Sequence, residues 1–205
     1  MAEYYVGIDI GGMTIKGIVL DGEGKALVED VAVTGSENGG DFMCDIIGEL
    51  VFSMLKKCGG TKEEAYVGVG CPGVIDSEHG VLVFSGNLNL RDYPLAKKIE
   101  DRIGIPVKVT NDANAAALGE AKFGAGKNYK SSILVTLGTG VGGGIIIDGK
   151  LFEGYKSAGA EIGHMGIERH GDVGTCGRRG CFEAYCHATA LVWRTRLPMG
   201  ETPRQ

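Results

Sequence analysis

Two glycine-rich turns are repeated in this sequence, at residues 9–12 and 138–144, and each lies between apolar runs typical of β-strands. These runs are residues 5–8 and 15–20 around the first turn, and residues 133–137 and 145–147 around the second. Asp148 and Gly149 then close the second unit as a hairpin turn. Because glycine has no Cβ, backbone N–H groups at such turns can approach phosphate oxygens closely. The repeat therefore predicts a nucleotide site built from two parts of the chain.

Two other interpretations of these turns remain open. Residues 138–143 resemble the G-x-G-x-x-G fingerprint of dinucleotide sites, but that fingerprint requires a helix directly after the turn. Three isoleucines and a hairpin follow instead, which argues against a nicotinamide or flavin site. Each turn is also compatible with an ordinary tight hairpin. The presence of two matched turns, the first with Asp9, favours phosphate binding.

The composition limits the class of protein. Glycine accounts for 36 of the 205 residues, well above the usual share of about 7%, and the excess falls in turns between periodic segments. The net charge of −5 and the lack of a long basic block argue against a nucleic-acid partner. No membrane-length apolar run or basic leader is present, so we expect a cytoplasmic protein with no membrane partner.

The order of expected elements is that of an α/β domain that begins to repeat. After the first hairpin we expect a strand at 26–33, a helix from Phe42 to Cys58, a strand at 66–69, a helix after Pro94, a strand at 107–110 and an alanine-rich helix to Lys122. We therefore divide the chain into an N-terminal α/β lobe at 1–120, with the first glycine turn, and a partial C-terminal lobe at 121–205, with the second.

The first polar cluster is at the end of the strand at 107–110. Asp112 follows that strand at the start of a helix, the position where open α/β sheets bind ligands. A carboxylate there can accept a hydrogen bond from a substrate hydroxyl and act as a general base. The alternative is that Asn111 or Asp112 is only a helix N-cap. Asp9 is a candidate Mg²⁺ ligand or, alternatively, a turn-forming residue.

A second polar cluster follows the second glycine turn. It contains Glu161, His164, Cys176, Cys181 and Glu183. One histidine and two thiols are typical zinc ligands, whereas the two glutamates can bind hydroxyl groups. The spacing of this cysteine pair is only moderately specific, so from these residues alone zinc and no metal are both open. Cys44, Cys58 and Cys71 are expected to pack in the core.

Five stretches together resemble the bacterial ROK family of sugar kinases, most of all its glucokinases. They are residues 7–12 (GIDIGG), 111–116 (NDANAA), 137–144 (LGTGVGGG), 159–164 (GAEIGH) and 176–185 (CGRRGCFEAY). The resemblance covers about residues 4–190. It implies an actin-like ATPase (ribonuclease H-like) α/β fold with two lobes, the second of them incomplete here, and transfer of the γ-phosphoryl group of ATP to a hexose.

The resemblance also implies roles for individual residues. Asp112 is the expected catalytic base, and the expected sugar contacts are Asn87, Asn111, Asp112, Glu161, His164 and Glu183. Asp9, Gly11, Gly12, Thr14, Gly138, Thr139 and Gly140 are expected around ATP and Mg²⁺. His164, Cys176 and Cys181 are the expected ligands of a structural Zn²⁺.

The sequence departs from the family pattern at several positions. Gly174 replaces the first metal cysteine, so a zinc ion would need water, Cys186, His170 or weaker binding to complete its ligands. Met13 replaces a threonine in the first glycine turn, and Leu90 replaces a frequent tryptophan near the sugar. From about Val192 the sequence no longer resembles the family's helix, which suggests truncation or a frameshift.

These departures shape the functional expectation. Glucose is the first candidate substrate, followed by other hexoses and N-acetylated amino sugars. A catalytically impaired remnant with partial sugar binding is the main alternative, and we expect weak or absent turnover from this chain. A sugar-responsive repressor is disfavoured because only eight residues precede Asp9. We expect a homodimer if the chain is complete.

Overall fold

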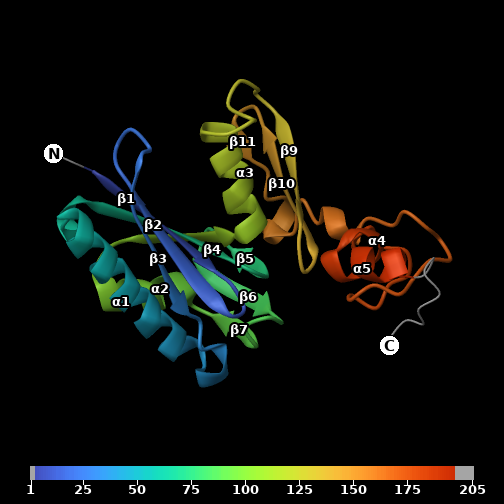
Figure 1. Cartoon of the computed structure of the whole chain (residues 1–205), viewed down its shortest axis with the longest axis horizontal. Coiled ribbons are helices and arrows are strands. Elements are labelled where there is room, and N and C mark those ends of the chain that lie inside the picture. Colours follow the sequence, from blue (N-terminus) through green and yellow to red (C-terminus); the bar gives the residue numbers. More distant parts are fainter. Residues whose placement is uncertain (1–2, 197–205) are drawn as a thin grey trace. The chain divides into compact units, whose positions relative to one another are not determined.

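The computed structural model describes residues 3–196, without the side chain of Lys156. The chain forms two compact units, Met1–Ala115 and Ala116–Gln205, and each is described by itself (Figure 1). Helix α3 (Asp112–Lys122) begins in the first unit and continues into the second. None of the described helices is both long enough and apolar enough to cross a lipid bilayer.

A five-stranded sheet forms the framework of the first unit (Figure 1). Its strands are β1 (Tyr4–Ile10), β2 (Thr14–Leu20), β3 (Ala26–Val33), β4 (Ala65–Cys71) and β8 (Val107–Asn111), in the order β3-β2-β1-β4-β8. β1, β2 and β3 pair antiparallel, whereas β1, β4 and β8 are parallel. The first glycine turn is thus the β1–β2 hairpin predicted from the sequence.

Helix α1 (Gly40–Cys58) packs its apolar stripe on one face of this sheet. Gly17 in β2 is needed for this contact, because a Cβ there would meet the Met54 side chain at 2.5 Å. The helix ends at Gly59, whose left-handed backbone (φ 76°) is the expected glycine stop. The buried core comes from alternate strand residues and from α1: Val6, Ile8, Ile10, Ile15, Val19, Ile47, Val51, Met54 and Leu55.

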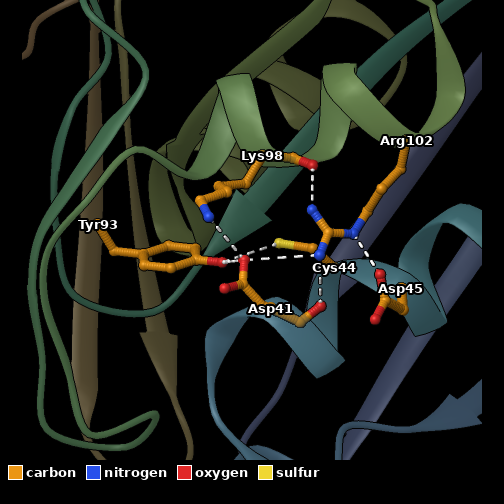
Figure 2. A network of polar contacts seen from close by, with 6 residues as sticks. All are labelled: Asp41, Cys44, Asp45, Tyr93, Lys98 and Arg102. Carbon is orange, nitrogen blue, oxygen red and sulfur yellow. Dashed lines mark hydrogen bonds and ion pairs between the residues drawn. The ribbon is translucent and has the colours of Figure 1, made fainter.

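A polar network joins α1 to α2 (Leu95–Ile103) and to the end of β7 (Leu90–Tyr93), as Figure 2 shows. The Arg102 guanidinium donates to the Asp45 carboxylate at 2.5 Å, to the Lys98 carbonyl at 2.7 Å and to the Asp41 carbonyl at 3.0 Å. The Asp41 carboxylate in turn accepts the Tyr93 hydroxyl at 2.9 Å. The network therefore fixes the first turns of α1 against α2.

A second small sheet lies between β4 and α2 in the sequence. It consists of β5 (Val74–Asp76), β6 (Val81–Ser85) and β7, paired antiparallel in that order. The expected element order had no strands here, and in this respect it was wrong. Short 3₁₀ turns at Ser36–Asn38 and Lys62–Glu64 complete the first unit.

The second unit has a three-stranded antiparallel sheet in the order β11-β10-β9. β9 (Ser132–Leu137) and β10 (Val141–Ile147) flank the second glycine turn, and β11 (Lys150–Leu151) follows the Asp148–Gly149 hairpin. Two 3₁₀ turns, Tyr155–Ser157 and Ile162–His164, precede the short helices α4 (Glu183–Cys186) and α5 (Ala188–Arg196). The expectation that the helix is lost from about Val192 was wrong for residues 192–196, because they belong to helix α5. Residues 197–200 lie outside the described residues.

Candidate active site

The first glycine turn is closed by its own backbone and held by a buried threonine. The Gly11 N–H donates to the Thr14 carbonyl at 2.8 Å, and a Cβ on Gly11 would lie 2.8 Å from the same oxygen. Gly12, in contrast, has open space where a Cβ would be. The fully buried Thr34 hydroxyl donates to the Gly11 carbonyl at 2.7 Å, and the Thr34 N–H donates to the Met13 carbonyl at 3.0 Å. The turn is therefore preformed for an anion on its open side.

Asp9 lies near Asp112 at the end of the sheet. Asp9 pairs with Gly70 across β1 and β4, and a Cβ on Gly70 would lie 3.5 Å from the Asp112 Cα. The pKa of Asp9 is raised, first by partial burial of its carboxyl group and second by the Asp112 carboxylate, while Lys16 opposes the shift. Carboxylate oxygens are preferred Mg²⁺ ligands, and a divalent cation would offset this repulsion. The two residues fit the requirements of a magnesium site.

Asn111 and Asp112 form the junction of β8 and α3. The Asn111 Oδ1 accepts the N–H groups of Ala113 at 2.9 Å and Asn114 at 3.2 Å, so the side chain of Asn111 caps the helix. The Asp112 carboxylate accepts the Ala113 N–H at 2.9 Å and is exposed to solvent. Since Asn111 caps the helix, Asp112 has oxygen atoms available for other partners.

The remaining candidate of the first unit is Asn87. It is exposed in the turn between β6 and β7, where the Asn89 N–H approaches the Gly86 carbonyl at 3.4 Å. The three-stranded sheet that carries this turn also contacts β8 through β5. The structure thus places Asn87 on the same unit as Asn111 and Asp112, on a separate turn.

In the second unit, the Glu183 carboxylate holds the second glycine turn. Its Oε2 accepts the Val141 N–H at 2.9 Å, and its Oε1 accepts the Thr175 hydroxyl at 2.5 Å. A Cβ on Gly140 would lie 2.7 Å from Oε2, so the turn approaches the carboxylate closely. Burial raises the pKa of Glu183, but the hydrogen bonds from Thr175 and Val141 outweigh it, and the net pKa is lowered. The group is therefore an ionised anchor of the turn at neutral pH.

His164 belongs to the 3₁₀ turn Ile162–His164, which packs against β10, and Glu161 directly precedes this turn. A Cβ on Gly163 would lie 2.2 Å from the Val141 carbonyl, which explains the glycine between them. The Glu161 carboxylate lies 4.0 Å from the His164 Nε2. Glu161 keeps oxygen atoms for a ligand hydroxyl, as the sequence suggests.

His164, Cys176 and Cys181 lie close enough for a shared metal. Their ligand atoms are within 4.8 Å of one another, and the two Sγ atoms are 3.5 Å apart. The His164 Nδ1 is buried and has no hydrogen-bond partner among the described residues. Zinc bound to two thiolates at about 2.3 Å in tetrahedral geometry would separate them by about 3.8 Å. The donor set therefore fits zinc, and neither Cys186 nor His170 belongs to the cluster in the described part of the chain.

Hydrogen bonding favours the thiolate form of Cys176. Its pKa is lowered, first by the backbone N–H of Arg178 and then by the Cys181 thiol. A thiolate is the form of cysteine that binds metals and attacks electrophiles. Cys176 is also the exposed member of the pair, whereas Cys181 is buried.

Sequence reasoning missed several residues that support these groups. Thr34 holds the first turn, and Thr175 binds the Glu183 carboxylate. Gly73 accepts the Asn111 side-chain N–H at 3.1 Å. None of the three has a distinctive motif, and Thr34 and Gly73 act through contacts between distant parts of the sequence.

Comparisons with known proteins agree with the motifs. A family model described as the ROK family matches residues 5–203. The chain is 38% identical over 200 residues to a glucokinase of Streptomyces coelicolor. The matched region covers 98% of this chain and 61% of that protein. It is 37% identical over 194 residues to the xylose repressor of Bacillus subtilis, covering 93% of this chain and 50% of the repressor.

A solved structure extends the comparison to the fold. The ROK family glucokinase from Streptomyces griseus in complex with glucose and AMPPNP matches with a TM-score of 0.83 and 38% identity, covering 98% of this chain and 62% of that one. The predicted α/β, actin-like fold class is confirmed. The expected loss of family resemblance near residue 190 was wrong, because the family match continues to residue 203.

Proposed function

This chain belongs to the ROK family, and from that premise we propose that it transfers the γ-phosphoryl group of ATP to a hexose, with glucose as the first candidate. The observation that carries the proposal is the junction of β8 and α3. There, Asn111 caps the helix and leaves the exposed Asp112 carboxylate beside Asp9. Phosphoryl transfer needs positioned groups and charge neutralisation more than a strong base, which suits this arrangement.

The first unit supplies the base and one phosphate turn. Asp112 accepts the proton of the attacking sugar hydroxyl, and the second Nδ2 proton of Asn111 donates to the sugar together with the Asn87 side chain. The turn at Gly11, Gly12 and Thr14 contacts the phosphates. Asp9 would hold Mg²⁺, which neutralises phosphate charge when bound.

The second unit supplies the other phosphate turn and further sugar contacts. Gly138, Thr139 and Gly140 contact the phosphates, and Glu161, His164 and Glu183 bind sugar hydroxyls. His164, Cys176 and Cys181 would hold a structural zinc ion, which crosslinks the loop that carries them. We expect the complete protein to form a homodimer.

A coupled assay of glucose 6-phosphate formation tests the proposal. It is run on this chain and on a chimera in which residues 1–190 are joined to the remaining segment of the Streptomyces coelicolor glucokinase. We expect weak turnover from the chain alone, since it spans 61% of that relative, and clear turnover from the chimera. Other hexoses and N-acetylated amino sugars are tested in parallel. A folded chimera that phosphorylates none of these sugars would overturn the proposal.

A further inference from the structure

Gly73 is at a position that only glycine can occupy, for two independent reasons. It lies in the turn between β4 and β5, and its φ of +117° is in the region that L side chains rarely adopt. A Cβ would also lie 2.2 Å from the Phe84 carbonyl oxygen and 3.0 Å from the Ser85 Cα, both of them backbone atoms. Neither neighbour can move aside as a flexible side chain would. The turn is therefore packed directly on β6.

The Gly73 carbonyl accepts the Asn111 side-chain N–H at 3.1 Å. Strand pairing brings the two residues together, because Cys71 is opposite Asn111 at the end of the parallel β4–β8 pair. The other end of the same amide, Oδ1, receives the N–H groups of Ala113 and Asn114. One side chain thus links the β4–β5 turn to the start of α3.

The orientation of this amide is determined by its partners. Exchanging its oxygen and nitrogen would place an oxygen against the Gly73 carbonyl and an NH₂ group against two backbone N–H donors. The Gly73 carbonyl therefore holds Asn111 in the one orientation that caps the helix. Asp112 follows Asn111 directly. Its backbone is therefore held on one side by Asn111, which is bound to Gly73, and on the other by Ala113, whose N–H is bound to the Asn111 side chain.

We propose that Gly73 is a positioning residue for Asp112: its carbonyl fixes the Asn111 amide, and the amide fixes the start of α3. The inference rests on the proposed function only where it predicts an effect on turnover. The simpler interpretation is that Asn111 is an ordinary N-cap for which the bond to Gly73 is incidental. The two interpretations differ in what they predict for Asn111→Asp.

Asn111→Asp separates the bond to Gly73 from the two capping bonds. Aspartate is as good an N-cap as asparagine, so the bonds to Ala113 and Asn114 are retained. Its second oxygen has no proton to donate to Gly73 and would face the carbonyl oxygen instead. Asn111→Ala removes all three bonds. An ordinary cap predicts that the start of α3 is the same in Asn111→Asp as in the wild type, whereas positioning by Gly73 predicts that Asp112 is displaced, as in Gly73→Ala.

The test uses the full chain for nuclear magnetic resonance and the chimera for kinetics. The matched control for Gly73→Ala is Gly68→Ala on β4, the strand before this turn, because a Cβ there has open space and Gly68 has no positive φ. We expect one Asn111 Nδ2 proton to exchange about 5- to 10-fold faster in Gly73→Ala than in the wild type and in Gly68→Ala. In Asn111→Asp, the Ala113 amide should stay protected, while the Asp112 amide resonance should shift by more than the same substitution causes in a short unstructured peptide.

The kinetic expectation follows from displacement of the base. The kcat of Gly73→Ala should fall by about 10²-fold with little change in KM, because small displacements of reacting groups have effects of that size. Asn111→Asp is tested by nuclear magnetic resonance alone, because it also removes the Nδ2 proton that is proposed to contact the sugar. Wild-type Nδ2 exchange at the rate of a free amide would overturn the proposal. So would an Asp112 resonance in Asn111→Asp that shifts no more than in that peptide, and this variant decides the matter even if Gly73→Ala does not fold. Absence of turnover in the wild-type chimera counts against the proposed function alone, since the exchange and resonance data still decide the role of Gly73.

Discussion

Gly174→Cys should convert a three-ligand cluster into a four-ligand zinc site. Gly174 lies in a tight hairpin, where its N–H donates to the Arg178 carbonyl at 2.8 Å. An added Cβ would lie 3.4 Å from the Cys181 Cβ and 3.6 Å from the Cys181 Sγ, which are ordinary contact distances. Gly174 is not among the residues with positive φ, so cysteine is sterically allowed. The new thiol would therefore reach the group formed by His164, Cys176 and Cys181.

The expected gain in affinity can be estimated from structural zinc sites. Such sites with four ligands bind zinc with apparent free energies of about 10–16 kcal/mol, or about 3 kcal/mol for each ligand. One added thiolate should thus lower the Kd for Zn²⁺ by about a hundredfold. The gain should be smaller at lower pH, because each thiol must lose its proton to bind the metal.

A competition titration against a chromophoric zinc chelator at pH 7 measures this change. Gly174→Ser is the matched control, since it adds the same Cβ with a hydroxyl in place of the thiol. A phosphine reductant is required, because a Cβ separation of 3.4 Å to Cys181 is close to that of a disulfide, about 3.5–4.5 Å. If Gly174→Cys binds zinc with the same Kd as Gly174→Ser and the wild type, a thiol at residue 174 does not join His164, Cys176 and Cys181 in one zinc site.

Three further changes test the two glycine turns and the base. Asp112→Asn in the chimera should lower kcat by about 10²–10⁴-fold and leave the sugar affinity within a few fold, as measured by initial rates and calorimetry. Thr34→Val should lower the free energy of unfolding by about 1–3 kcal/mol in urea titrations, because the Gly11 carbonyl loses its buried partner, whereas Thr34→Ser should stay near the wild type. The lowered pKa of Glu183 means that its contribution to stability is present above the ordinary glutamate pKa of about 4.3 and is lost as the pH falls through the folded-state pKa. The unfolding temperature should therefore drop in this acidic range for the wild type and less for Glu183→Gln; equal drops would contradict the assigned role.

The helices and the main sheet could be predicted from the sequence because their signals are local. Apolar residues spaced every four positions and a glycine stop predict the helix from Phe42 to Cys58, and the structure has it from Gly40 to Cys58. The small sheet of β5, β6 and β7 has no such signal. Its strands have three to five residues, and Asn89 and Asp92 beside and within them have positive φ. These strands exist through their cross-strand partners, which a single window of sequence does not contain.

The sequence indicated the candidate site residues better than the residues that hold them in place. Asp112, Asn111 and the cluster of His164 with two cysteines were selected by residue type together with the family resemblance. The groups that hold them act across long separations: Thr34 is 23 residues from Gly11, and Asn111 is 38 residues from Gly73. A threonine after a strand or a glycine after a proline is too common to indicate such a role. The fold had to be known before these partners could be paired.

The cysteine pair and the second glycine turn are parts of one connected structure within the second unit. Thr175 precedes Cys176, and Glu183 follows Cys181 by two residues, so the 2.5 Å bond from Thr175 to Glu183 runs beside the pair of sulfur atoms. The same carboxylate accepts the Val141 N–H at the end of the glycine turn. A metal ion bound by the two cysteines would therefore also hold Thr175 close to Glu183, and Glu183 close to the turn. The cysteine loop and the phosphate turn are joined through a single carboxylate.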